Sequence, residues 1–190
     1  NKFGQGYELE VKLSIPKPKH VQRRSADLNP VLGDETTIKE DKLKPCLEEL
    51  GSEELFEEIT EKGSGSGLFQ QMSTDGYIPR EALVSWIIVE NRGDNVMKWL
   101  KSEFSDVSMI EHYMSLYKFK IGKQEDKTIG YLFSTVEKNK KELKISEYAL
   151  SQTTLDQIFT NFAMMGEIEK AGLKKRRTAT PFAVEEIERP

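Results

Sequence analysis

The chain has few of the residues on which common catalytic and metal sites depend. Its 190 residues include one cysteine, Cys46, and two histidines, His20 and His112. A single cysteine cannot form an internal disulfide, which suits a reducing compartment such as the cytosol. The histidines stand far apart in the sequence and no second cysteine completes a ligand set. We therefore expect no metal site and interpret both histidines as surface or partly buried side chains.

Long apolar runs and phosphate-binding glycine motifs are also missing. The longest apolar stretch lies within residues 82–89, whereas a membrane-spanning helix needs roughly 18 or more apolar residues. No signal-peptide pattern is evident. No GxxxxGK[ST] sequence occurs, so we expect the chain neither to bind nor to hydrolyse ATP. Residues 73–76 offer one carboxylate, too few for a calcium loop.

The chain also lacks an excess of charge of one sign. Its 28 basic and 32 acidic side chains leave a net charge of −4, so no strong field attracts nucleic acid or an anionic membrane. Hydrophobic residues make up 37% of the chain, which is enough for a modest core. No nucleophile–base pair or metal-ligand set is apparent, and we predict that this chain is not an enzyme and holds no cofactor.

Strand and helix patterns alternate over most of the chain. Residues 7–15 alternate apolar and polar side chains, which predicts a strand with Tyr7, Leu9, Val11, Leu13 and Ile15 on its buried face. Residues 80–90 and 94–104 predict two helices, separated near Arg92–Gly93. The later elements that we predict are a hairpin over 108–121 that bends at 112–115, a helix over 128–141, a strand over 143–150, and a helix that Thr154 and Gln157 cap and Gly166 ends.

Residues 16–78 show little of this regularity. They contain two short acidic helical patterns and the sequence GSGSG at 63–67, which is either a natural linker or an engineered splice. We expect this block to decorate the core without forming a core of its own.

The order of elements predicts an α+β fold, namely a ferredoxin-like split βαβ (βαββαβ) layer with an extra C-terminal helix and a long insertion after strand 1. One domain would cover 1–166, with its core in 1–15 and 79–166 and the insertion in 16–78. A charged tail would occupy 167–190.

Two segments resemble a known family. Residues 145–163, ISEYALSQTTLDQIFTNFA, resemble the C-terminal ending of A-subfamily (lipid-exporter type) ABC transporters. Residues 2–11, KFGQGYELEV, resemble the exit of that family from its nucleotide-binding domain. The resemblance covers roughly residues 1–15 and 94–166, and the block at 16–78 departs from it. The positions that we assign to an interaction or structural motif are Phe3, Gly4, Gly6, Tyr7, Ser151, Gln152, Thr153, Thr154, Leu155, Asp156, Gln157, Ile158, Phe159 and Phe162.

The resemblance implies a non-catalytic regulatory domain on the cytosolic side of an integral membrane transporter. Its partners would be the nucleotide-binding domains and the sister regulatory domain, while ATP and magnesium would act in the parent transporter. The membrane would be reached only through the parent protein, nucleic acid would not be a partner, and an isolated domain could pair with a second copy. Two other interpretations stay open. One is a small-molecule sensor, which needs an apolar pocket, and the other is an RNA-binding sheet with Tyr117 and Phe119 as stacking aromatics.

Overall fold

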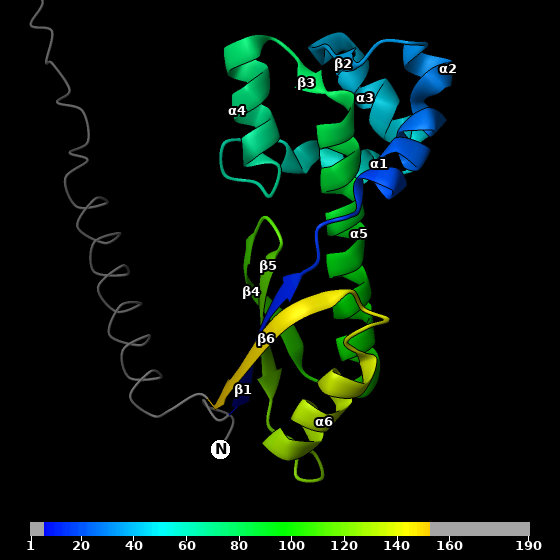
Figure 1. Cartoon of the computed structure of the whole chain (residues 1–190). Helices are drawn as coiled ribbons and strands as arrows, with labels where there is room; N and C mark the ends of the chain where they lie inside the picture. Colours follow the sequence, from blue (N-terminus) through cyan, green and yellow to red (C-terminus); the bar gives the residue numbers. More distant parts are fainter. Residues whose placement is uncertain (1–5, 153–190) are drawn as a thin grey trace, which may run out of the picture. The chain divides into compact units, whose positions relative to one another are not determined.

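The computed structural model describes residues 6–152 (Figure 1). The helix predicted after Thr153 and the tail at 167–190 lie outside this part, as do Phe3 and Gly4. The described residues contain helices and antiparallel sheets, which confirms the α+β class. Within residues 6–152, no helix is both long and apolar enough to cross a membrane.

The larger sheet has four strands, β1 (Gly6–Leu13), β4 (Val107–Tyr113), β5 (Leu116–Gly122) and β6 (Ile145–Gln152). Their order in the sheet is β4-β5-β1-β6, and all three neighbouring pairs are antiparallel. The predicted hairpin is confirmed, with its turn at Met114–Ser115. The predicted helix before the last strand is also confirmed as α6 (Ile129–Asn139), where the Thr128 hydroxyl accepts a hydrogen bond from the Tyr131 backbone N–H at 3.2 Å.

One face of this sheet carries its hydrophobic core. The registered pairs Leu9–Phe119 and Val11–Tyr117 place alternate side chains of β1 and β5 on the same face. Leu132 and Val136 of α6 pack against this face together with residues of the long helix α5 (Arg80–Glu103). Ile15, predicted for the same face, lies beyond the end of β1 and is exposed, because the prolines that follow lead the chain away from the sheet.

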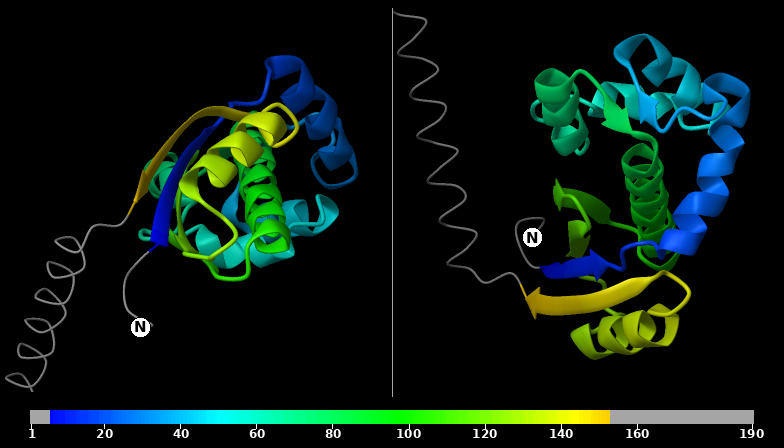
Figure 2. Two further views of the ribbon diagram at one scale, coloured as in Figure 1. Left: turned by 90° about the horizontal axis from the view of Figure 1, so that it is seen from below. Right: turned by 45° about the horizontal axis from the view of Figure 1, so that its top comes forward.

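Residues 18–79 and the first half of α5 form a second region, here called the helical block. Figure 2 shows its helices gathered around the first half of α5, away from the four-stranded sheet. Its elements are α1 (Pro18–Ser25), η1 (Ala26–Leu28), α2 (Asn29–Leu32), β2 (Thr37–Ile38), α3 (Glu40–Glu49), η2 (Glu53–Glu58), α4 (Ser66–Asp75) and β3 (Ile78–Pro79), with β2 and β3 paired as a small antiparallel sheet.

The helical block has a hydrophobic core of its own, so the expectation of a mere decoration is wrong. Leu28, Ile38, Cys46 and Leu47 are almost completely buried in it, and Leu83 of α5 joins them. The sequence pattern concealed this core because its elements are short, and each contributes only one to three apolar side chains. Residues 63–67 were predicted as flexible coil, but residues 63–65 form the turn before α4 and residues 66–67 are its first two residues.

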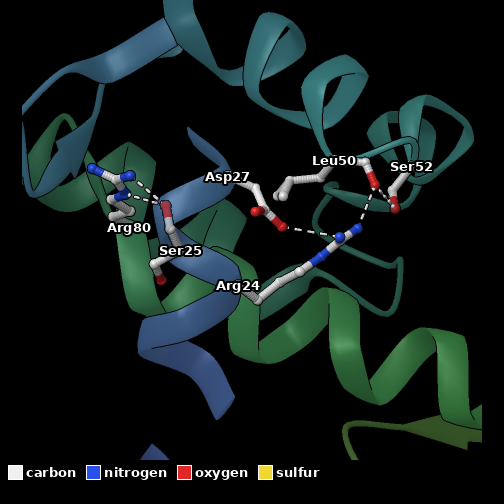
Figure 3. A network of polar contacts seen from close by, with 6 residues as sticks. All are labelled: Arg24, Ser25, Asp27, Leu50, Ser52 and Arg80. Atoms are coloured by element: carbon white, nitrogen blue, oxygen red, sulfur yellow. Dashed lines mark hydrogen bonds and ion pairs between the residues drawn. The ribbon is translucent and has the colours of Figure 1, made fainter. Parts of the chain in front are cut away.

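Two arginines hold the helical block together through backbone carbonyls (Figure 3). Arg80, the first residue of α5, donates from Nε to the Ser25 carbonyl at 2.9 Å and from Nη2 to the Asn29 side-chain oxygen at 2.6 Å. It also donates from Nη1 to the Gly33 carbonyl at 3.1 Å. Arg24 donates to the Leu50 carbonyl and to the Asp27 carboxylate, both at 3.0 Å. A single guanidinium can serve several acceptors at once, so each arginine ties consecutive short helices to one another.

The helix α5 runs without interruption through Arg92 and Gly93, so the predicted break at these residues is wrong. A Cβ atom at position 93 would lie 2.3 Å from carbon atoms of the Tyr117 ring. The glycine is therefore required by the close approach of β5 to the helix, and it does not mark the end of a helix.

Candidate interaction surface and a buried polar cluster

The structure brings the described parts of the two motif segments together. Tyr7 pairs with Gln152, and Glu8 pairs with Ser151, in the antiparallel register of β1 and β6. These segments are separated by more than a hundred residues of sequence and meet at one end of the sheet. Ser151 and Gln152 are exposed there, whereas Tyr7 is buried. The assigned positions from Thr153 to Phe162 lie outside the described residues.

Gly6 lies in β1, one residue before the start of the predicted strand, and pairs with Gly122 of β5. A Cβ at position 6 would lie 2.7 Å from the Ile121 carbonyl oxygen, so glycine lets two backbones approach at this end of the sheet.

The sheet face opposite the hydrophobic core is polar and carries charges of both signs. Lys118 lies 3.4 Å from the Glu8 carboxylate and Lys12 lies 3.2 Å from that of Glu147. Glu10 and Ser151 belong to the same face by the strand register. The Lys12–Glu147 pair is exposed and contributes little to stability, whereas the Lys118–Glu8 pair is partly buried.

The aromatic side chains that favoured RNA binding are not accessible. Tyr117 and Phe119 are buried between the sheet and its helices, on the face opposite the charged one. Bases stack only on exposed rings, so the observation that supported an RNA-binding sheet is lost.

A polar cluster that the sequence did not predict lies where the helical block meets the sheet. Glu90 of α5 is buried, and its Oε1 lies 3.4 Å from Nε2 of His112 on β4. The same Nε2 lies 3.1 Å from the Met114 carbonyl oxygen. The His112 ring stacks on Tyr117 with a centroid distance of 4.0 Å, and the Tyr117 hydroxyl donates to the Val89 carbonyl at 3.4 Å.

The surroundings favour the neutral form of both members of the Glu90–His112 pair. Burial raises the pKa of Glu90 to about 7, and the nearby carboxylates of Glu58 and Asp94 act in the same direction. The Ser64 hydroxyl and the Trp86 indole N–H oppose this rise in the Glu90 pKa, although neither reaches good hydrogen-bond geometry. Burial also lowers the pKa of His112. Low polarity at this position therefore outweighs the attraction between opposite charges.

This arrangement joins α5 to β4 through a buried polar contact. Among residues 6–152, no three histidine, cysteine or carboxylate side chains converge on a metal site. His112 is partly buried, which agrees with the interpretation of the histidines as surface or partly buried side chains. In the sequence, the one sign of this contact is that Glu90 directly follows the apolar stretch 82–89. Helix periodicity predicts that a side chain at this position is buried.

The comparisons with known proteins identify one matching family and several similar proteins. The family described as "ABCA1-like, C-terminal R1 regulatory domain" matches residues 86–152. The cholesterol transporter ABCA5 of Mus musculus is 32% identical over 95 residues, which are 50% of this chain and 6% of that protein. The human ATP-binding cassette sub-family A member 13 is 32% identical over 90 residues, which are 47% of this chain and 2% of that protein. The human sub-family A member 2 is 28% identical over 91 residues, which are 48% of this chain and 4% of that protein.

The chain thus corresponds to a small part of the length of these relatives. No solved structure matches it significantly. The family match begins at Trp86, so α1 to α4 lie outside it.

Proposed function

We propose that this chain, which belongs to the C-terminal regulatory domains of A-subfamily ABC transporters, modulates ATP-driven transport by contacting the nucleotide-binding domains and the sister regulatory domain of its parent transporter. The parent would lie in a membrane, with this domain on the cytosolic side. ATP and Mg²⁺ would bind to the nucleotide-binding domains and not to this chain. A lipid is the proposed cargo, because relatives such as ABCA5 are named cholesterol transporters.

The observation that carries this proposal is the pairing of the two motif segments at one end of the sheet. Gly6–Tyr7 and Ser151–Gln152 resemble family segments at opposite ends of the domain, and they are neighbours in β1 and β6. A partner that binds this end would contact both segments at once. Such a domain changes the transport cycle only by the difference between its affinities for two arrangements of the nucleotide-binding domains.

A ferredoxin-like split βαβ arrangement is part of the proposal. It is supported by the chain order β1, α5, β4, β5, α6, β6, and by the sheet order β4-β5-β1-β6 with antiparallel neighbours. In this arrangement both helices cover one face and the opposite face is left for partners.

The test uses the parent transporter with Ser151→Arg, because Ser151 is exposed on the charged face beside Glu8. We expect the ATPase rate or its coupling to lipid transport to change about fivefold or more, which is the usual size of a coupling between sites. Glu54→Arg, on the exposed surface of the helical block, is the matched control and should change neither. Equal rates for Ser151→Arg and wild type, at equal expression, would refute the proposed contact. Deletion of 151–162 extends the test to the whole motif.

A further inference from the structure

A groove of about 1000 Å³ lies between the helical block and the turn of the β4–β5 hairpin. One wall comes from α4 and the loop before it, the second from Trp86 and Val89 of α5, and the third from the hairpin turn. Its volume is at the upper end of the range found for small-molecule sites. Both regions of the described structure therefore contribute to the same groove.

Large apolar side chains are exposed along this groove. Ile15, Tyr113 and Met114 line it and are 76%, 66% and 62% exposed, and Phe69 is partly exposed on the opposite wall. These side chains gather around one hollow and do not lie scattered over the surface. A contiguous apolar patch of this kind marks a binding site.

The polar groups of the groove are almost all uncharged. Five serines and the Gln70 amide lie among the residues that line the groove, and Glu61 is the one charged side chain of this lining. The Ser64 hydroxyl and the Trp86 indole N–H are buried and interact with the Glu90 carboxyl group, so they do not open onto the groove. The other serine hydroxyls and the Gln70 amide line the groove. Groups of this type can hydrogen-bond to a hydroxyl or carbonyl oxygen of a ligand.

We propose that this groove binds an uncharged, mainly apolar molecule with a hydroxyl or carbonyl head group, of the class to which long-chain alcohols and monoacylglycerols belong. The apolar walls take the hydrocarbon body, and the accessible serine hydroxyls and the Gln70 amide of the lining hydrogen-bond to the head group. An anionic head is disfavoured by Glu61, the charged side chain of the lining. The binding itself stands apart from the proposed contact with nucleotide-binding domains. A regulatory effect of the ligand on transport rests on the proposed function. The ligand would act by fixing the helical block against the four-stranded sheet, because it contacts both.

The test uses the full 190-residue chain and three probes that share a ten-carbon tail: decanol, decanoate and decyltrimethylammonium. The chain has two tryptophans, and Trp99 packs in the sheet core, so Trp99→Phe leaves Trp86 as a reporter inside the groove. We expect decanol to shift the Trp86 emission to shorter wavelength and to raise the melting temperature. Decanoate, which Glu61 repels, and decyltrimethylammonium, whose head group has no hydrogen-bonding atom, should bind at least about tenfold more weakly.

Gly67→Leu is the matched variant, because a Cβ at this exposed position of α4 meets no atom within 4 Å and the leucine side chain occupies the groove. It should keep the melting temperature and lower decanol affinity about tenfold or more. Gly130→Leu, at an equally open position of α6 outside the groove, should leave decanol binding unchanged. No response to decanol, equal binding of a charged probe, or unaltered affinity in Gly67→Leu would overturn the proposal. None of these results depends on the Ser151→Arg test in the transporter, so the two proposals fail independently.

Discussion

The sheet region (β1, β4–β6, α6 and the second half of α5) and the helical block bury their side chains in different ways. In the sheet region, burial follows a period of two along strands such as β5, and the family match covers this region apart from β1. In the helical block, single leucines from short elements converge, and arginine bonds to carbonyls hold those elements together. The part of the chain that the family match covers thus has a regular pattern of buried side chains. The helical block lies largely outside the match, and its fold depends on specific tertiary contacts.

The helix α5 belongs to both regions. Leu83, Val84 and Ile87 of its first half lie in the core of the helical block, and Val96 and Leu100 of its second half lie in the sheet core. A rigid helix that crosses from one core into the other couples their unfolding, because unwinding either half exposes apolar surface in both. The four predictions below test how far the two regions differ and how tightly they are coupled.

The largest effects should come from truncating one core at a time. We expect Phe119→Ala in the sheet region and Leu47→Ala in the helical block to lower the free energy of unfolding by about 3–5 kcal/mol each. Both residues are fully buried. Because α5 is shared, each variant should lower one common transition. Denaturant unfolding in Trp99→Phe and Trp86→Phe backgrounds follows the two regions separately, since Trp86 packs in one core and Trp99 in the other. Two resolved transitions would show that the regions fold independently.

The second effect concerns the polar contacts of the helical block. Arg80→Met keeps the aliphatic stem and removes the donors to Ser25, Asn29 and Gly33. We expect a loss of about 2–4 kcal/mol, since charged hydrogen bonds contribute more than neutral ones and the Ser25 carbonyl would lose its donor. Arg23→Met at an exposed position of α1 is the control and should cost less than about 0.5 kcal/mol. Similar losses of unfolding free energy in both variants would mean that the hydrogen bonds of Arg80 do not specifically stabilise the helical block.

The third prediction compares two helical glycines. Gly93→Ala forces a methyl group against the Tyr117 ring, and we expect it to destabilise the protein by about 1–3 kcal/mol. Gly130→Ala in α6 meets only the Thr128 hydroxyl oxygen, at 3.7 Å, and should stabilise the protein by about 0.5–1 kcal/mol through helix propensity. Thermal melts of both variants give opposite signs if the approach of β5 to α5 explains Gly93. A stabilising Gly93→Ala would contradict that explanation.

The same glycine shows why part of the fold was predictable from sequence and part was not. Strand alternation and the helical spacing of apolar residues over 128–141 are local signals, and they predicted β1, the hairpin and α6. The role of Gly93 depends on Tyr117, which lies on a strand formed later in the chain, and a local pattern cannot contain such a contact. Helix propensity alone favours a break at Arg92–Gly93, and tertiary packing overrides that preference.

The candidate site was also predictable from the sequence only in part. The motif segments were identified by resemblance, and the structure adds that Tyr7 and Gln152 are paired. The Glu90–His112 pair and the groove could not be predicted, because each is assembled from segments distant in sequence. Cys46 is an intermediate case: its exclusion from a disulfide was predictable, but its full burial among leucines depends on how α3 packs.

The smallest predicted effect concerns Glu90, whose neighbours come from both regions. Ser64 and Glu58 belong to the helical block, His112 and Tyr117 to the sheet region, and Trp86 and Asp94 to α5. Because burial raises the pKa of Glu90 from 4.5 to about 7, the folded state holds this proton more tightly than the unfolded state. The stability that the protonated carboxyl contributes is therefore present below pH 4.5 and is lost as the pH rises to about 7.

The lowered pKa of His112 acts in the opposite sense below its unfolded pKa of roughly 6.5, so the two groups partly cancel in the wild-type protein. Glu90→Gln removes only the carboxyl contribution and keeps a side chain that can bond to Ser64 and Trp86. The variant should therefore gain about 1–2 kcal/mol over wild type between roughly pH 5 and pH 8. Glu111→Gln, exposed on the neighbouring strand β4, is the control and should show no such gain. Denaturant midpoints of Glu90→Gln and wild type, measured at about pH 5 and about pH 8, give this gain in stability. If the substitution changes stability equally at the two pH values, Glu90 does not titrate in this range.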